Sequence, residues 1–340
     1  MKNIMVSIVI LNMNERHFLP TCLGSIRKMN FPYEYEIILV DNGSTDGSQE
    51  FVRKNFPHVK LIENKTNLGY AEGNNIGAKA AKGKYLMLLN NDTEVTKNWL
   101  LNLLKVAESD DNIGICAPKQ LMGDKKTILY GGGAINYTGL SYSINMYKKD
   151  FKETEIHETA FASGAALFIR RDIVHKIGLF DKDYFIYHED VDLSWRVRLA
   201  GYKIMYVPTS IIYHFFKFKR RLQKMYLLER NRFMTVLKNY STRSIALVLP
   251  MLLLLEVPNF LYSIARGWSI FKIKSYFYIL QNLGKIIKKR QVVQRSRKVD
   301  DKKIVNLFTS DIFYAQESEK ISSIASQFLK SYWLLIKNRF

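Results

Sequence analysis

The residue types best suited to chemistry stand just after four short apolar segments of β character. They are small and polar: Asn12, Asp41, Asn67 and the run Asn90-Asn91-Asp92. In an open parallel sheet, ligands bind beyond the carboxyl ends of the strands, so we expect these side chains to line one crevice. No Walker lysine motif and no GxGxxG follows a strand, which disfavours a P-loop enzyme and a dinucleotide-binding enzyme.

Asp92 is the candidate metal ligand of this set. A bound diphosphate needs its charge offset, and Mg²⁺ or Mn²⁺ held by one or two carboxylates provides that offset. The competing interpretation is a helix N-cap, because Asn-Asp-Thr leads towards a helical segment. The residues alone leave both interpretations open.

A second cluster holds three carboxylates within four residues, at Glu189, Asp190 and Asp192. It lies at the expected start of a helix, where the helix dipole favours ionised acids. A carboxylate held here near an acceptor hydroxyl could act as a general base. The alternative is helix capping with an ion pair between Asp192 and Arg196, which we favour for Asp192 and only in part for Asp190.

Strand-like and helix-like segments alternate along the first part of the chain and must position these residues. The expected strands are Val6–Leu11, Glu36–Val40, Val59–Ile62, Tyr85–Leu89 and Ile113–Ala117. The expected helices are Phe18–Ile26, a segment from Ser48 onward, Gly69–Ala81 and Trp99–Val106. This alternation predicts βαβ units and a mostly parallel sheet.

The pattern is less regular after Ala117. Residues 118–160 are rich in Gly, Tyr, Lys and Asn, and we expect an irregular excursion over one end of the sheet. Regular structure is expected to return as strands Ala165–Ile169, Lys203–Val207 and Ile211–His214, and as a helix Asp190–Ala200 that ends at Gly201. The sequence therefore predicts an α/β domain over residues 1–216.

The formal net charge of +20 is unevenly distributed. Residues 1–216 carry a net charge of +2, whereas residues 217–340 carry +18. Such an asymmetry indicates a basic surface that faces nucleic acid or lipid headgroups, with a solvated basic tail as the alternative. No nucleic-acid-binding motif is present, so we expect an anionic membrane surface and no nucleic acid as the partner.

Long helical patterns with basic faces fill residues 217–340. The segment Ile245–Leu255 is apolar but contains Pro250, and Glu256 and Pro258 follow it. Because a bilayer span takes about 20 apolar residues, we expect an interfacial or re-entrant segment rather than a span.

The segment Trp268–Arg290 combines apolar residues at helical spacing with a basic face. A basic amphipathic helix with Trp and Phe is typical of a helix that lies in a membrane interface. The alternative is a helix that packs on the α/β domain and turns its basic side to water.

Two cysteines, Cys22 and Cys116, form no CxxC and have no paired spacing, so neither a zinc site nor a disulfide framework is indicated. They fit a reducing compartment. The N-terminal run Ile4–Leu11 is short and is followed by no small-residue cleavage site, so it is expected to be a buried strand rather than a secretion signal. We therefore expect the protein at the cytoplasmic face of the cell membrane, peripheral or with a re-entrant segment.

The sequence resembles the inverting GT-A glycosyltransferases of family 2, especially their rhamnosyltransferase-like branch. The resemblance is carried by six segments in the family's order, which cover most of residues 5–215: VSIVILNMNE at 6–15, VDNGSTDGS at 40–48, NLGYAEGNNIG at 67–77, LNNDTEV at 89–95, SGAALFIRRDIVHKIGLFD at 163–181 and YHEDVDLSWRVRLAGYKIMYVP at 187–208. It implies a GT-A fold, which is Rossmann-like with a mostly parallel sheet, followed by a helical, basic, membrane-associated region over 217–340.

The resemblance also implies roles for individual residues. Asp41 would contact the nucleobase, with Asn12 at the same end. Asn91 and Asp92 fall on the Asp-x-Asp metal motif, so Asp92 would hold Mg²⁺ or Mn²⁺. His214 falls where relatives often place a His that reaches the diphosphate or the metal, although a buried structural histidine is the competing interpretation.

The remaining assignments concern the donor helix and the acceptor side. The match over 67–77 places Asn67, Gly69 and Asn74 in the nucleotide-sugar-binding set. Asp190 falls on the position of the catalytic base. Ser163, Gly164 and Glu189 are expected near the acceptor or the transferred sugar. One departure is that Asn90 and Asn91 stand where many members carry acids, so the charge at the metal depends on Asp92.

The implied function is inverting, metal-dependent transfer of a hexosyl or rhamnosyl group. The donor would be a nucleotide-diphosphosugar with a dTDP, UDP or GDP carrier. The acceptor would be a hydroxyl of a glycan or lipid-linked glycan in cell-surface polysaccharide or glycoconjugate synthesis. The alternative is a non-catalytic nucleotide-sugar-binding or scaffold protein of a membrane glycan-assembly complex.

Overall fold

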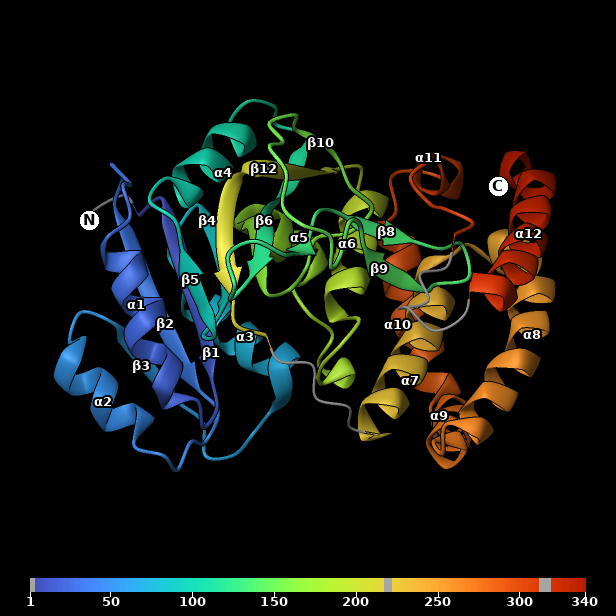
Figure 1. The fold of residues 1–340 in the computed structure, drawn as a ribbon, viewed down its shortest axis with the longest axis horizontal. Helices are drawn as coiled ribbons and strands as arrows, with labels where there is room; N and C mark the ends of the chain where they lie inside the picture. Colours follow the sequence, from blue (N-terminus) through green and yellow to red (C-terminus); the bar gives the residue numbers. More distant parts are fainter. Residues whose placement is uncertain (1–3, 217–221, 312–318) are drawn as a thin grey trace. The chain divides into compact units, whose positions relative to one another are not determined.

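The computed structural model describes residues 4–216, 222–311 and 319–340, the last range by backbone alone as far as residue 326. The chain forms two compact units (Figure 1). The α/β unit comprises Met1–Gly133, Ser143–Val197 and Tyr202–Phe218. The helical unit comprises Ala134–Tyr142, Arg198–Gly201 and Lys219–Phe340. Two short pieces of the N-terminal part of the sequence therefore belong to the helical unit.

The α/β unit is built on a sheet with the strand order β10-β12-β6-β11-β4-β1-β2-β3, with β5 paired to β12 and β7 paired to β6. Its strands are β1 (Val6–Asn12), β2 (Tyr35–Asp41), β3 (Lys60–Glu63), β4 (Tyr85–Asn90), β5 (Thr93–Val95), β6 (Ile113–Met122), β7 (Ile128–Tyr130), β10 (His157–Glu158), β11 (Ala166–Arg170) and β12 (Lys203–His214). The expected alternating α/β architecture is confirmed.

The sheet is parallel over β1 to β4 and mixed beyond them. Strand β1 pairs in parallel with both β2 and β4, and β2 pairs in parallel with β3. Strand β11 is antiparallel to both β4 and β6, and β12 is parallel to β6. The antiparallel strand β11 therefore brings the residues that precede it to the carboxyl end of β4, where Asn90 N–H donates to Ala165 O at 2.9 Å.

Helices cover both faces of this sheet. They are α1 (Leu19–Arg27), α2 (Ser48–Asn55), α3 (Gly69–Ala80), α4 (Trp99–Ala107), α5 (Arg171–Ile177) and α6 (Glu189–Leu199), with 3₁₀ turns η1 (Arg16–Phe18) and η2 (Lys182–Tyr184). Alternate residues of β1, β2 and β4 form one core with α1, α2 and α4, and Figure 1 shows α1 over the blue strands. Gly73 and Gly77 let α3 approach β1 on the other face, because a Cβ at either position would lie 2.3 Å from a strand side chain.

Three local expectations for this unit are corrected. Asp92 is followed by strand β5 and not by a helix, so the helix-cap interpretation is wrong. The two strands expected over 203–214 form one strand, β12, with a register shift between Val207 and Ile211 that the intervening Pro208 accompanies. The excursion over 118–160 is more regular than expected, because β6 continues to Met122 and four short strands follow it.

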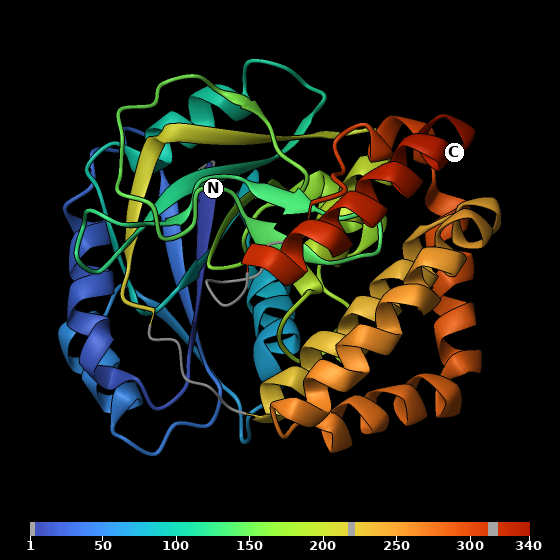
Figure 2. The same ribbon diagram turned by 45° about the vertical axis from the view of Figure 1, so that its right-hand side comes forward.

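The helical unit consists of short strands and helices, drawn from gold to red in Figures 1 and 2 except for the green strands. Its elements are α7 (Leu222–Asn239), α8 (Thr242–Ala265), α9 (Ser269–Gln281), α10 (Leu283–Ser296), α11 (Asp301–Val305), α12 (Glu319–Ile336) and the turn η3 (Lys337–Arg339). Strands β8 (Gly133–Ile135) and β9 (Ser141–Ser143) pair as a two-stranded sheet. The chain passes into the helical unit after Gly133 and leaves it before Ser143. Tyr137 between these strands stacks on Trp333 at 4.9 Å, and Tyr240 donates to Tyr137 O at 2.8 Å.

Two expectations for the tail are corrected. Helix α8 runs through Pro250 and Pro258 as one 24-residue helix, so neither proline ends it. The helix expected over Trp268–Arg290 is two helices, α9 and α10, divided at Asn282. A proline inside a helix removes one backbone hydrogen bond and its ring crowds the preceding turn, but the backbone of α8 stays helical across both prolines.

Within the described residues, one helix is long and apolar enough to cross a membrane, namely α8. Glu256 near its middle does not face outward, because it pairs with Arg232 Nη2 at 2.5 Å and with Lys272 Nζ at 2.8 Å. Glu229 pairs with the same two cations at 3.1 and 2.7 Å. Helices α7, α8 and α9 therefore share a buried cluster of two carboxylates and two cations, which we call the paired-charge cluster.

Candidate active site

The carboxyl ends of β1 and β2 are joined by a buried polar network. Asn12 Nδ2 donates to Asp41 Oδ2 at 3.0 Å and lies 3.2 Å from Ser44 Oγ. Asp41 Oδ1 accepts from Ser44 N–H and from Gln49 Nε2, both at 2.8 Å. Asn91 Nδ2 donates to Asn12 Oδ1 at 2.8 Å. The parallel register, which pairs Asn12 with Asp41, brings these residues together, as strand-end reasoning predicts.

The turn that leads into α3 is organised by two asparagines. Asn67 Oδ1 accepts from Gly69 N–H at 2.9 Å, and Asn42 Nδ2 donates to Gly69 O at 3.0 Å. Gly69 has φ +82°, and a Cβ there would lie 2.5 Å from the ring of Phe185. Asn74 is buried and donates to Tyr70 O within α3. Asn67, Gly69 and Asn74 therefore stabilise the turn and the first turns of α3. Their expected contacts with a nucleotide-sugar stay predictions.

Asp92 and His214 are brought side by side by the pairing of β5 with β12. Thr93 is the register partner of His214, and Phe215 N–H donates to Asp92 O at 2.8 Å. His214 Nε2 lies 3.1 Å from Asp92 Oδ1 and 3.5 Å from Asn90 Nδ2. Asp92 Oδ1 and His214 Nδ1 are both buried without a hydrogen-bond partner among the described residues.

This arrangement fits a divalent cation. Two adjacent ligands of an octahedral ion at about 2.1 Å lie about 3.0 Å apart, close to the separation of Asp92 Oδ1 and His214 Nε2. A carboxylate oxygen and an imidazole nitrogen suit Mn²⁺, and Mg²⁺ prefers the carboxylate. The described residues contain no group of three or more His, Cys, Asp or Glu suited to a metal.

Asp190 lies in the first turn of α6 and is fixed by backbone donors. Its Oδ2 accepts from Gly164 N–H at 2.9 Å, and its Oδ1 accepts from Val191 N–H at 2.8 Å. Gly164 O accepts from Tyr70 Oη at 2.6 Å. One peptide segment before β11 is thus held between the hydroxyl of α3 and the carboxylate of α6, which fixes where Asp190 points.

The two neighbouring acids at the start of α6 carry no cation partner among the described residues. Burial raises the pKa of Asp190, against the opposing effect of its two backbone N–H bonds. Burial also raises the pKa of Glu189 well above its ordinary value, and the charge of Asp190 adds to that shift. Glu189 Oε2 has no hydrogen-bond partner among the described residues. A raised carboxylate pKa is typical of a general base that works near neutral pH.

The segment before α6 is strained. Phe185, Tyr187 and His188 have φ values of 63°, 72° and 67°, in the left-handed region that non-glycine residues rarely occupy. Ala71 N–H donates to Phe185 O at 3.0 Å, so the start of α3 holds this segment. Strained backbone next to a carboxylate pair is characteristic of functional sites, where surrounding contacts maintain it.

The structure brings most of the expected residues into three local groups. Asn12, Asp41 and Asn91 form one, Asp92 and His214 the second, and Gly164, Glu189 and Asp190 the third, with half-buried Ser163 beside Gly164. Asp192 instead pairs with Arg196 at 2.8 Å, and this expected structural role is confirmed. Asp41 is fully buried, and the role expected for it at a nucleobase stays a prediction.

Sequence reasoning missed Tyr70, Ser44 and Gln49. Ser44 lies within the matched segment VDNGSTDGS, and Gln49 follows it directly. The resemblance pointed to this segment but did not predict the hydrogen bonds of these two residues to Asp41. Tyr70 lies within NLGYAEGNNIG, but its hydroxyl bonds to a residue 94 positions away. No local pattern predicts such a contact.

The sequence of this chain matches the model of one known protein family. The sequence model of glycosyl transferase family 2 matches residues 7–178, just over half of the chain. The chain belongs to glycosyl transferase family 2. The matched region contains β1 to β4, the Asn90-Asn91-Asp92 run and Gly164, and the resemblance stated from the sequence is confirmed.

Two curated enzymes are similar in sequence to this family member. An N-acetylglucosaminyl-diphospho-decaprenol L-rhamnosyltransferase of Mycobacterium tuberculosis is 28% identical over 203 residues, which cover 52% of this chain and 66% of the relative. A poly-beta-1,6-N-acetyl-D-glucosamine synthase of Staphylococcus epidermidis is 25% identical over 209 residues, which cover 61% and 48%. The chain thus spans less than two thirds of the length of these curated relatives.

Solved structures confirm the GT-A fold. GalNAc-T7 with UDP, GalNAc and Mn²⁺ has a TM-score of 0.57 at 21% identity and covers 71% of this chain and 49% of that one. TarS residues 1–349 of S. aureus has a TM-score of 0.54 at 16% identity and covers 98% and 90%. The mannosyltransferase PcManGT of Pyrobaculum calidifontis, solved with GDP-Man and Mn²⁺, has a TM-score of 0.51 at 14% identity and covers 86% of each chain.

Proposed function

We propose that this family 2 protein is an inverting glycosyltransferase that moves a sugar from a nucleotide-diphosphosugar to a hydroxyl of a glycan or lipid-linked glycan. The observation that carries the proposal is the carboxylate of Asp190, which is fixed by Gly164 N–H, has a raised pKa and has no cation partner among the described residues. A carboxylate in that state can accept a proton from a sugar hydroxyl.

In the proposed reaction the acceptor hydroxyl oxygen attacks the anomeric carbon of the donor sugar. The proton of that hydroxyl passes to Asp190, and the bond between the anomeric carbon and the diphosphate oxygen breaks. The nucleoside diphosphate leaves with the bonding electron pair, and attack from the opposite side inverts the configuration. Gly164 N–H keeps the Asp190 carboxylate oriented, and burial together with the charge of Asp190 raises the pKa of the neighbouring Glu189.

Asp92 and His214 would hold the divalent cation in this proposal. When bound, a divalent cation offsets the charge of the diphosphate and stabilises its departure. Asn91 and Asn12 connect Asp92 to the network around Asp41, where the nucleobase end of the donor would lie. Two solved relatives that share the fold carry Mn²⁺ together with UDP or GDP-Man, which supports a divalent cation and a nucleotide-sugar here.

The acceptor class follows from chemistry and from the relatives. The name of the mycobacterial relative includes a diphospho-decaprenol acceptor and L-rhamnosyl transfer, which supports a lipid-linked acceptor and a hexosyl or rhamnosyl donor for this chain. Ser163 and Gly164 lie beside Asp190 and would border the acceptor hydroxyl. Cell-surface polysaccharide or glycoconjugate synthesis is the process that such a product would serve.

Membrane association of the helical unit is part of the proposal. Helix α8 exposes an apolar stripe at helical spacing: Leu249, Leu253, Leu254, Val257, Leu261 and Ile264. Residues 217–340 also carry a net charge of +18. An apolar stripe combined with basic charge favours a helix in the interface of an anionic leaflet. Because Glu256 is held by buried cations, we propose that α8 lies in the plane of the membrane at its cytoplasmic face.

The test is donor turnover by purified protein with and without an acceptor. Wild-type protein is expected to release nucleoside diphosphate from one donor among UDP-, dTDP- and GDP-sugars, and Asp190→Asn is expected to bind that donor without turning it over. A wild-type protein that binds donor but never turns it over, with a lipid-linked acceptor present, would support the non-catalytic scaffold instead. Retention of all three acids, Asp41, Asp92 and Asp190, favours the enzyme.

A further inference from the structure

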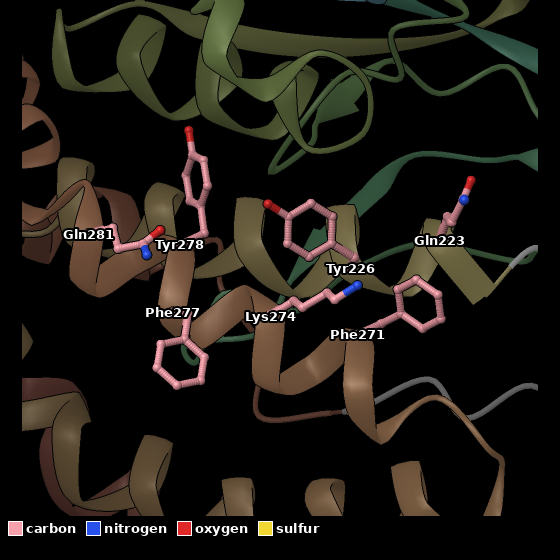
Figure 3. Close-up of a pocket in the computed structure, with 7 residues that line it drawn as sticks. All are labelled: Gln223, Tyr226, Phe271, Lys274, Phe277, Tyr278 and Gln281. Carbon is pink, nitrogen blue, oxygen red and sulfur yellow. The ribbon is translucent and has the colours of Figure 1, made fainter.

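A groove within the helical unit shares no residue with the site described above. It lies between α7 and α9, is open to solvent and has a volume of about 400 Å³, a size typical of sites for small ligands. Figure 3 shows its lining. Tyr226, Phe271, Phe277 and Tyr278 supply four aromatic rings, Lys274 supplies an amine and two glutamines supply amides. No carboxylate is among the described residues that line the groove.

The aromatic wall of the groove is fixed from behind. Tyr226 and Tyr278 meet edge to face, with ring centroids 6.5 Å apart. The guanidinium of Arg230 lies 5.3 Å from the ring of Tyr226 and 4.7 Å from that of Tyr278. Cation–π contacts of a buried Arg with two rings hold those rings in place. A ligand that enters the groove therefore meets rigid apolar surfaces that need little ordering.

Lys274 is the charged group of the groove. Its side chain runs past Tyr226 toward Phe271 in Figure 3, and its Nζ lies 5.7 Å from the Phe271 ring. The acids of the neighbouring helices α7 and α8, Glu229 and Glu256, are already paired with Arg232 and Lys272. Lys274 has no ion-pair partner among the described residues and is exposed, so its charge is available to an anion.

An apolar surface continues from the groove along the same helix. Phe277 lines the groove and is 59% exposed, and Leu280 and Ile270 on α9 are 68% and 54% exposed. Leu283 and Ile287 continue this exposed apolar surface onto α10. A hydrocarbon chain that leaves the groove would therefore cover side chains that otherwise face water.

We propose that this groove binds the diphosphate end and the first hydrocarbon units of the single-chain lipid diphosphate that carries the acceptor glycan. Lys274 and the glutamine amides would bind the phosphate oxygens, while the four rings and the α9 surface would cover the chain. The inference rests on the proposed function, because only a glycosyltransferase that uses a lipid-linked acceptor would need a site for that lipid.

The experiment uses the full chain and measures the dissociation constant of farnesyl diphosphate by titration calorimetry. EDTA is present, so that a metal-dependent site for diphosphate does not contribute. Farnesol and inorganic diphosphate are titrated in parallel. Farnesol has the hydrocarbon chain without the diphosphate, and inorganic diphosphate lacks the chain. Lys274→Gln is compared with Lys288→Gln, a matched change on α10 that is exposed and does not line the groove.

The expected result is binding of farnesyl diphosphate at least tenfold tighter than binding of either half. Lys274→Gln should weaken it about tenfold, as expected for the loss of one charged hydrogen bond, and Lys288→Gln should leave it unchanged. Equal weakening by both variants would show a general basic surface that attracts phospholipid headgroups and would overturn the proposal. Binding of inorganic diphosphate as tight as that of farnesyl diphosphate, or the absence of binding, would overturn it as well.

Failure of the groove and failure of the proposed function are separated by a second readout on the same preparations. Metal-dependent stabilisation by a nucleotide-sugar reports the α/β unit, and Lys274→Gln should leave it unchanged. If wild-type protein binds farnesyl diphosphate but no nucleotide-sugar, the glycosyltransferase proposal fails. If it binds and turns over the donor but Lys274→Gln has no effect on farnesyl diphosphate, only the groove proposal fails.

Discussion

The two units of this protein treat buried carboxylates in opposite ways. In the helical unit, Glu229 and Glu256 share the cations of Arg232 and Lys272 at distances between 2.5 and 3.1 Å. Among the described residues of the α/β unit, Asp190 accepts only from backbone N–H groups, and Asp92 Oδ1 lies beside the imidazole of His214. Both sets are largely removed from water, but only the first is neutralised by cations of the chain itself.

The pKa shifts follow this difference. Burial would raise the pKa of Glu229, but the charges of Arg232 and Lys272 outweigh it and lower that pKa. Burial raises the pKa of Asp190 and of Glu189 with no cation to oppose it. Buried charges compensated within the chain serve the fold, whereas uncompensated ones indicate a ligand, a proton or a metal ion as the missing partner. This contrast indicates a structural role for the paired-charge cluster and a catalytic role for the acids at the start of α6.

The largest expected effect is on turnover, in the variant Asp190→Asn, which changes an acid of the α/β unit that has no cation partner among the described residues. Loss of a general base typically lowers turnover by about 10²- to 10⁴-fold, and donor binding should be retained. Folding should not suffer, because a buried carboxyl with a raised pKa lowers the free energy of unfolding above its unfolded-state pKa. Steady-state release of nucleoside diphosphate and a thermal unfolding curve measure both effects. Turnover within threefold of wild type would remove Asp190 from the mechanism.

The converse change on the compensated side is Glu229→Ala. It leaves Arg232 and Lys272 with one carboxylate fewer, and breaking a buried ion pair typically costs about 3 to 5 kcal/mol of stability. Chemical denaturation monitored by far-ultraviolet circular dichroism measures this loss. The control is Glu63→Ala, which removes a 45% exposed partner of Arg53 and should change the stability by less than about 1 kcal/mol. Equal losses in both variants would contradict a special role for the paired-charge cluster.

The pH dependence sharpens the contrast between the two units. Asp190 must be ionised to accept a proton, and its pKa is raised, so turnover should fall as the pH drops through a range above the ordinary Asp value of about 4. Glu229 has a lowered pKa, so its contribution to stability is present above the ordinary Glu value and should disappear only in stronger acid. Activity should therefore be lost at a pH where unfolding curves still show the native state. Simultaneous loss of activity and fold would contradict this separation.

The smallest expected effect concerns Tyr70→Phe. Removing the hydroxyl deletes its bond to Gly164 O and loosens the backbone at Gly164, the residue whose N–H group holds Asp190. One neutral hydrogen bond contributes about 0.5 to 1.5 kcal/mol, so kcat should fall about two- to tenfold while KM for the donor is unchanged. The acid limb of the pH profile should also move to higher pH. Tyr85→Phe, which removes a hydroxyl bonded to Glu108, is the matched control and should leave kcat unchanged.

The sequence predicted those parts of the molecule that depend on local periodicity and on strand ends. The apolar strands of the α/β unit and the polar residues after β1, β2 and β4 lie as expected, because parallel strands bring their carboxyl ends to one edge. The carboxylate cluster already marked Asp190 as a possible base, and the family resemblance added its role and that of His214. The assignment of Asp190 drew on segments whose order along the chain is a stronger signal than any single motif.

The remaining features depend on contacts that no local pattern contains. Strand β5 replaced an expected helix start after Asp92 because Thr93–Val95 pairs with β12, more than 110 residues later. Tyr70 acts on Gly164 across 94 positions. Helix α8 continues through two prolines because tertiary contacts of Glu256 and the buried residues around it outweigh the local helix-breaking signal.

The most direct test of the uncompensated site is a thermal-shift measurement with UDP-, dTDP- and GDP-sugars, with Mn²⁺, with Mg²⁺ and with EDTA, on wild-type protein, Asp92→Asn and Asp110→Asn. A ligand at one hundred times its dissociation constant stabilises the folded state by about 2.7 kcal/mol. One donor should raise the midpoint of wild-type protein and of the control Asp110→Asn, which lies outside the candidate site, only when a divalent cation is present, and Asp92→Asn should lose that shift. A shift of equal size in EDTA or in Asp92→Asn would contradict the assignment of Asp92 and His214 to the cation.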